Sequence, residues 1–84
     1  MYYVYILRSL KDRNFYIGSS ENLVRRINEH KSGKVKSTKN RLPVSLICYE
    51  AYNFKEEMLA REKYLKSSDG RKSLRKRLTK SLVD

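Results

Sequence analysis

The feature that most limits the possible folds is an apolar run near the start of the chain, residues 2–8 (Tyr-Tyr-Val-Tyr-Ile-Leu-Arg). Nearly all of its side chains are aromatic or β-branched, which is typical of a strand buried on both faces. The chain has 84 residues, enough for one small domain with a single core and too few for a second. We therefore expect residues 1–84 to form one domain.

Two further apolar segments predict strands. Residues 15–17 (Phe-Tyr-Ile) follow a polar link, residues 9–14, that is rich in turn-forming residues. This arrangement predicts an antiparallel hairpin with the first strand. Residues 44–49 predict a third strand, with Leu46, Ile47 and Cys48 at its buried centre.

The first amphipathic helix is expected over residues 23–31, with Ser20 or Asn22 as its N-cap and Gly33 as its stop. Its buried face is marked by Leu23 and Ile27, four residues apart. At about 100° per residue, Arg26 and His30 fall beside this apolar stripe, whereas Arg25 points away from it. The pattern predicts a partly sheltered Arg26 and a solvated Arg25.

Two more helices are expected in the second half of the chain. One runs over about residues 54–66, and a short one follows Gly70, which is expected to break the chain. Their apolar positions recur at helical spacing: Phe54, Met58 and Leu65 in one, Leu74, Leu78 and Leu82 in the other. The order strand, strand, helix, strand, helix, helix predicts an α+β domain, a small antiparallel sheet of three strands packed with three helices.

The charge balance points to a polyanionic partner. Twenty Lys and Arg against nine Asp and Glu give a net charge of +11. Such self-repulsion favours a partner that neutralises it, either nucleic acid or an anionic membrane surface. We expect contacts to a nucleic-acid backbone from two basic groups: Lys34, Lys36, Lys39 and Arg41 in an exposed loop over residues 31–41, and Arg71, Lys72, Arg75 and Lys76 in the last helix.

The numbers of cysteine and histidine residues and the length of the longest apolar run exclude other classes of protein. One cysteine, Cys48, cannot form an internal disulfide, and one cysteine with one histidine cannot close a zinc site. The longest apolar run is far shorter than the roughly 20 residues of a membrane span, and no signal peptide is present. We therefore expect a soluble cytoplasmic protein that does not enter the membrane, and we take it to be a monomer.

Several side chains that carry chemistry are expected to meet near the hairpin. Tyr5 and Tyr16 lie on its two strands, Gly18 permits close approach of a ligand, and Arg26 and His30 share one helix face. Taken alone, the two tyrosines are more typical of an ordinary core than of a site, and a helical histidine beside an apolar stripe is more often structural. The spacing of the whole set favours a site.

These residues resemble the GIY-YIG nucleases, a family that includes the amino-terminal nuclease of the excinuclease C subunit and many small single-domain proteins. The second half of the name is present as Tyr16-Ile17-Gly18, and the first half appears as Tyr3-Val4-Tyr5, which keeps the tyrosine. Three further elements follow in the family's order: Gly18-Ser19-Ser20 with Asn22, Leu23, Arg26 and His30; Leu42-Pro43 with Glu50; and Ala60-Arg61-Glu62-Lys63 with Leu65-Lys66. The family's late asparagine has no counterpart after Glu62, so that role is unassigned.

The resemblance implies an endonuclease that hydrolyses DNA in repair or recombination with one Mg²⁺ or Mn²⁺ ion. Glu62 then corresponds to the metal ligand, and Arg26 offers planar charged donors suited to a phosphate. One tyrosine activates water and the other contacts the phosphate, in an order that the sequence leaves open, while His30 takes or relays a proton. Gly18 and Ser19 would lie against the nucleic acid. Without a second domain, selectivity for branched or otherwise unusual structures, or weak sequence preference, is expected.

Three alternatives stay open at this point. Glu62 can instead form an ion pair with Lys66, four residues further along the helix. The same scaffold can be a non-catalytic module that binds DNA or RNA. It can also be a basic interaction protein, bound to ribosomes or to an acidic partner, whose tyrosines belong to the core.

Overall fold

The computed structural model describes residues 1–80 and contains one antiparallel sheet. Its strands are β1 (Tyr2–Ser9), β2 (Phe15–Ser20) and β3 (Val44–Tyr52), in the order β2-β1-β3. The residues of β1 from Val4 to Ser9 are all buried, which confirms the predicted strand with two buried faces. β2 continues past the predicted residues 15–17 to Ser20, so it carries Gly18 within the sheet.

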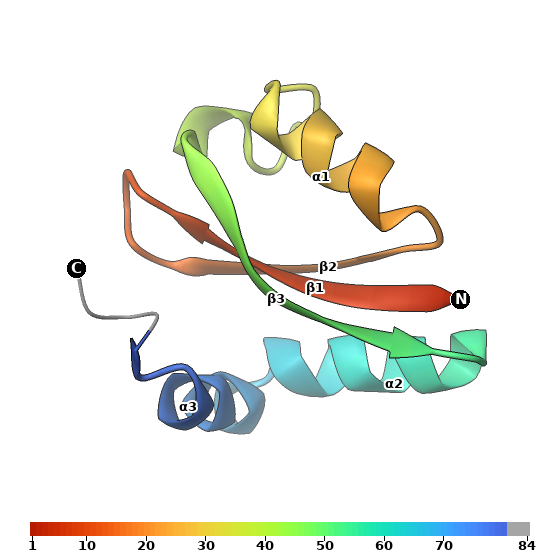
Figure 1. Cartoon of the computed structure of the whole chain (residues 1–84). Coiled ribbons are helices and arrows are strands. Elements are labelled where there is room, and N and C mark those ends of the chain that lie inside the picture. The colour runs from red at the N-terminus through yellow and green to blue at the C-terminus, as the bar shows by residue number, and fades with distance from the viewer. Residues whose placement is uncertain (81–84) are drawn as a thin grey trace.

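Helices cover both faces of this sheet (Figure 1). α1 (Leu23–Lys31) lies on one face, and α2 (Lys55–Lys66) and α3 (Ser68–Arg77) lie on the other. A short 3₁₀ turn, Lys39–Arg41, precedes β3. The arrangement confirms the predicted α+β architecture, and α1 has the predicted bounds. Within residues 1–80, none of the helices has the length and apolar character needed to cross a membrane.

Side chains alternate along the strands between two separate apolar clusters. Even-numbered residues of β1 face α2 and α3, whereas odd-numbered residues face α1, as the two-residue period of a strand requires. The first cluster contains Val4, Ile6, Ile17, Met58, Leu65 and Leu74. The second contains Tyr5, Leu7, Ile27 and Val44, with Tyr16 and Leu23 packed against it.

The ends of α1 follow from local chemistry. The Asn22 side chain accepts a hydrogen bond from the Arg25 backbone N–H, so Asn22, and not Ser20, is the N-cap. Beyond the C-terminus, Gly33 has a φ of 78°, in the left-handed region that ends helices and favours glycine. These two signals confirm the predicted stop and fix α1 relative to β2.

Two predictions about the second half of the chain are wrong. Gly70 does not break the chain but lies buried in the first turn of α3, where an added Cβ would collide with the Tyr64 carbonyl oxygen. Close approach of α3 to the end of α2 therefore requires glycine there. Phe54 is 63% exposed because it is the N-cap residue of α2 and lies outside the packed stripe. Leu82 lies outside the described residues.

The basic segment over residues 31–41 is only partly the exposed loop that was predicted. Its lysines are exposed, but Val35 and Thr38 are buried between them. Ser9 Oγ donates a hydrogen bond to the Arg41 carbonyl oxygen over 2.6 Å, which ties the segment to the end of β1. The segment is thus attached to the core at several points.

Candidate active site

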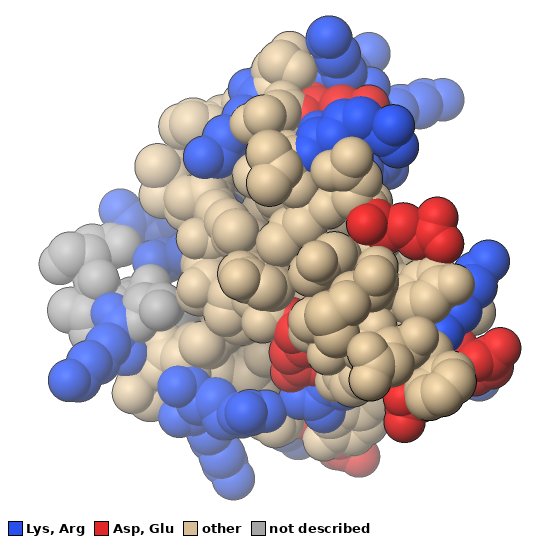
Figure 2. Space-filling model, turned by 45° about the vertical axis from the view of Figure 1, so that its right-hand side comes forward, with Lys and Arg blue, Asp and Glu red and all other residues tan. Residues whose placement is uncertain are grey.

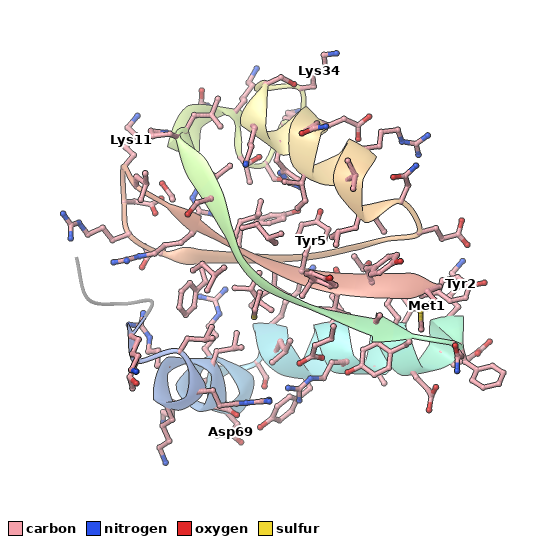
Figure 3. The ribbon with its side chains drawn as sticks, in the orientation of Figure 1. Met1, Tyr2, Tyr5, Lys11, Lys34 and Asp69 are labelled. Atoms are coloured by element: carbon pink, nitrogen blue, oxygen red, sulfur yellow. The ribbon has the colours of Figure 1, made fainter. Side chains whose placement is uncertain are left out.

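Tyr5 lies directly over Gly18 on the face of the sheet that carries α1. The antiparallel register pairs these two residues, and Tyr5 is only 1% exposed. A Cβ built on Gly18 would stand 2.5 Å from Tyr5 Cζ and closer still to the phenolic oxygen. The phenol therefore occupies the space that a side chain at position 18 would need. Figure 3 shows Tyr5 between the sheet and α1.

His30 brings α1 to the two tyrosines. Its Nε2 lies 2.7 Å from the Tyr5 hydroxyl oxygen, and the imidazole is fully buried. The ring centroid of His30 is 5.4 Å from that of Tyr5 and 5.1 Å from that of Tyr16. Three rings from β1, β2 and α1 thus form one cluster, as the sequence predicted.

Burial keeps His30 neutral at physiological pH. Loss of hydration, with a smaller contribution from the positive charge of Arg26, lowers the pKa of His30 to about 4, and the charge of Glu29 opposes the change. A neutral imidazole has one N–H donor and one acceptor nitrogen. His30 therefore enters the site as a hydrogen-bonding group and not as a cation.

This pKa predicts a pH-dependent stability. The pKa of His30 lies below the value of about 6.5 expected in the unfolded chain, so the unfolded state takes up a proton first. The contribution is fully present above pH ~6.5 and is lost progressively as the pH falls to about 4, by up to ~3 kcal/mol. Urea unfolding of the wild type and of His30→Gln from pH 7 to 4 should show a flatter decline in the variant. Parallel curves would contradict a neutral buried His30.

Arg26 places a permanent charge beside Tyr5. Burial raises the pKa of Tyr5, a side-chain hydrogen bond with Arg26 opposes this rise, and the charges of Tyr16 and Glu62 add to it. The Arg26 side chain is 39% exposed and also forms an ion pair with Glu29 over 3.3 Å. Arg25 is exposed, as predicted from the helical period. Arg26 thus acts on the buried Tyr5 phenol while part of its own side chain is exposed to solvent.

Tyr16 is the more accessible of the two tyrosines. It is half-buried, and its hydroxyl accepts a hydrogen bond from Ser37 Oγ over 3.2 Å. The next residue, Thr38, places its Oγ1 2.7 Å from His30 Nδ1. Sequence reasoning missed both hydroxyl residues, whose only visible signal is that they interrupt a run of lysines.

Glu62 approaches the site from the opposite face of the sheet. Its Oε1 accepts a hydrogen bond from Ser19 Oγ over 2.9 Å, and its Oε2 lies 3.1 Å from Lys66 Nζ. Ser19 follows Gly18 on the edge strand β2. Glu62 contacts this strand at Ser19 from one face of the sheet, and Tyr5 contacts it at Gly18 from the other face. The ion pair with Lys66, which the sequence left open as an alternative to a metal-binding role, is present, and the charge of Glu62 also raises the pKa of Tyr5. Within residues 1–80, no three His, Cys, Asp or Glu side chains gather as a metal site.

The predicted backbone-binding residues lie in two separate places. Lys34 and Lys36 border an open groove of about 640 Å³ that Arg26, Val35 and Ser37 also line. Arg41 is bound to Asp12, with 2.7 Å between Nε and Oδ2, and Lys39 is exposed nearby. The other basic residues, Arg71, Lys72, Arg75 and Lys76, belong to α3 on the far side of the sheet. Figure 2 shows blue side chains gathered at the top and at the bottom of the molecule, with mostly uncharged surface between them.

Comparison with known proteins finds relatives that match most of the chain. A UPF0213 protein of Clostridium perfringens is 39% identical, with 100% of this chain and 90% of the relative covered. A UPF0213 protein of Staphylococcus saprophyticus is 36% identical over 88% of this chain and 90% of its own length. The solution NMR structure of a UPF0213 protein from Bacillus halodurans has a TM-score of 0.55 and 38% identity, with coverage of 88% of this chain and 82% of the other.

The family assignment covers almost the whole described structure. The sequence model of the GIY-YIG catalytic domain matches residues 1–78. This range includes both tyrosines, Arg26, His30 and Glu62, the residues that the structure gathers around Gly18 and Ser19. The chain belongs to the GIY-YIG catalytic domain family, a family of nuclease domains.

Proposed function

We propose that this protein is a magnesium-dependent endonuclease that hydrolyses DNA phosphodiester bonds in the cytoplasm, with selectivity for branched or partly single-stranded substrates in repair or recombination. The observation that carries the proposal is the meeting of two phenols, an imidazole and a guanidinium over Gly18, with a carboxylate held at Ser19. Hydrolysis of such a bond needs an activated water, a clamp on the phosphoryl oxygens and stabilisation of the leaving oxygen.

Burial and charge support different roles for the side chains. Arg26 is partly exposed and permanently charged, which suits it to hold a phosphoryl oxygen. Tyr16 is half-buried and can meet water at the site, whereas Tyr5 is buried and has a raised pKa, so it remains a phenol at neutral pH. We assign water activation to Tyr16, and to Tyr5 the task of orienting Arg26.

Glu62 is suited to a hard divalent cation. Carboxylate oxygen is the ligand that Mg²⁺ prefers, and one carboxylate with waters and a substrate phosphate is a normal set. The ammonium group of Lys66 already lies against Oε2, so this carboxylate oxygen stands where a positive charge can be held. When bound there, Mg²⁺ or Mn²⁺ would neutralise charge on the phosphoryl group and its leaving oxygen. Ser19 holds Oε1 and fixes the direction of the carboxylate.

The direct test is cleavage by the purified protein. We expect nicking of a branched DNA in the presence of Mg²⁺, loss of nicking on addition of a chelator, and slower cleavage of a perfect duplex. A branched RNA of the same sequence tests the choice of nucleic acid. Binding that weakens steeply with salt, without turnover in any metal, would identify the chain as a non-catalytic binding module instead.

The groove beside Arg26 predicts which basic group contacts the substrate. We expect the double change Lys34→Glu and Lys36→Glu to weaken DNA binding by at least about tenfold and to reduce the slope of log K against log salt by about 2. Lys72→Glu with Lys76→Glu alters the net charge equally but on α3, and should have a much smaller effect on DNA binding. Fluorescence anisotropy over a salt series measures both. Equal effects of the two pairs would show that only overall charge matters.

A further inference from the structure

Thr38 is a buried hydroxyl residue within a segment that otherwise looks like an exposed basic loop. It is 0% exposed, although lysines at positions 36 and 39 are exposed. Two backbone hydrogen bonds hold it, from Thr38 N to the Val35 carbonyl over 3.1 Å and from Arg41 N to the Thr38 carbonyl over 2.9 Å. Its side chain is therefore fixed toward the interior, and its Oγ1 meets His30 Nδ1 at 2.7 Å.

His30 connects Thr38 to the site. Both imidazole nitrogens lie 2.7 Å from a hydroxyl oxygen, Nδ1 from Thr38 and Nε2 from Tyr5. All three side chains have an exposed fraction of 1% or less. Because a neutral imidazole donates from one nitrogen and accepts at the other, the direction of one hydrogen bond determines the direction of the other.

The stronger donor decides that direction. A phenol is a stronger hydrogen-bond donor than the aliphatic hydroxyl of Thr38, so of the two hydroxyl partners of His30 it is Tyr5 that donates. The Tyr5 hydrogen then needs an acceptor, and His30 Nε2 is within hydrogen-bond distance. Nε2 can accept only if the ring proton is on Nδ1, and Nδ1–H in turn needs the Thr38 oxygen. The donors run one way: from Tyr5 to His30, and from His30 to Thr38.

We infer that Thr38 is a positioning residue: by accepting from His30 Nδ1–H it holds the imidazole in the tautomer that fixes Tyr5 and, through it, the phosphate-binding guanidinium of Arg26. The inference deepens the proposed function and rests on it for the role of Arg26. The tautomer itself depends on no activity. No proton leaves the chain of hydrogen bonds, so the residues act by orientation alone.

Nitrogen NMR tests the tautomer without DNA or metal. His30 is the one histidine in the sequence, so its two ring nitrogens give unambiguous signals in ¹⁵N-labelled protein. We expect a protonated Nδ1 and an unprotonated Nε2 at pH 7. The opposite pattern would overturn the inference. This result is independent of whether the protein cleaves DNA, so failure of the inference and failure of the proposed function can be told apart.

Substitution of Thr38 tests the consequence for the site. Thr38→Val keeps the shape but removes the acceptor, and we expect loss of the single-tautomer pattern and a roughly tenfold fall in kcat with little change in KM. Thr38→Ser should restore both, and Thr79→Val is a matched control at an exposed threonine. Wild-type kcat and an unchanged tautomer in Thr38→Val would overturn the inference. If Thr38→Val does not fold, a serine variant with a mixed tautomer pattern would equally contradict it.

Discussion

Replacing Glu62 by glutamine is expected to reduce DNA cleavage about a thousandfold while the protein stays folded. The amide keeps an oxygen that can accept from Ser19, but it loses the negative charge that would hold a divalent cation near the phosphoryl group. The ion pair with the half-exposed Lys66 is lost too, which costs at most about 1 kcal/mol of stability. Single-turnover cleavage of a branched DNA at saturating Mg²⁺ measures the effect.

Two controls make this result specific. Glu57→Gln removes the same charge from an exposed position in the first turn of α2 and should leave cleavage unchanged. Binding of Mn²⁺, followed by paramagnetic broadening of amide signals near Ser19, should disappear in Glu62→Gln and persist in Glu57→Gln. Unaltered cutting by Glu62→Gln would refute the one-metal assignment, whatever the Mn²⁺ result.

A methyl group at Gly18 is expected to destabilise the protein by about 2–3 kcal/mol and to lower cleavage at least a hundredfold. The added Cβ would overlap the Tyr5 phenol, which packs between β2 and α1 and cannot move without breaking its hydrogen bond to His30. Overpacking of a well-filled core costs free energy of this size. Urea unfolding of Gly18→Ala measures the stability, and the branched-DNA assay measures the cleavage.

A double-mutant cycle identifies the cause of this effect. In a Tyr5→Leu background the phenol is absent, so Gly18→Ala should cost little free energy, or even stabilise the strand by about 0.5 kcal/mol through reduced backbone freedom. A coupling free energy of about 2 kcal/mol between the two positions would show that the phenol is the obstacle. Equal destabilisation in both backgrounds would place the cause elsewhere in β2.

The hairpin and the first helix were predictable because their patterns are local. The run in β1 is apolar at every position, and α1 begins after Asn22 and ends before Gly33, where side-chain capping and a left-handed backbone act within a few residues. Gly70 shows the limit of this reasoning. Glycine occurs both where a helix ends and where two backbones touch, and only the packing of α3 on α2 distinguishes the two cases here.

The site shows the same difference between local patterns and long-range contacts more clearly. Family motifs identified Tyr5, Tyr16, Arg26 and His30, and the helical period placed Arg26 and His30 beside the apolar stripe. Neither signal indicated Thr38 or Ser37, whose hydroxyls contact His30 and Tyr16 across 8 and 21 residues of chain. The approach of Glu62 to Ser19 spans 43 residues. Such contacts depend on the path of the chain between the elements.

The sequence by itself determined the order of strands and helices, the strongly cationic surface and the family, because hydrophobic period, charge and short motifs are properties of neighbouring residues. Only the tertiary structure decided that Tyr5 fills the space above Gly18, that Glu62 comes from the other face of the sheet, and that buried Thr38 supports His30. Those relations arise when the edge strand β2 is packed between helices on both sides, and this packing is fixed by the cooperative burial of two clusters that no local pattern describes.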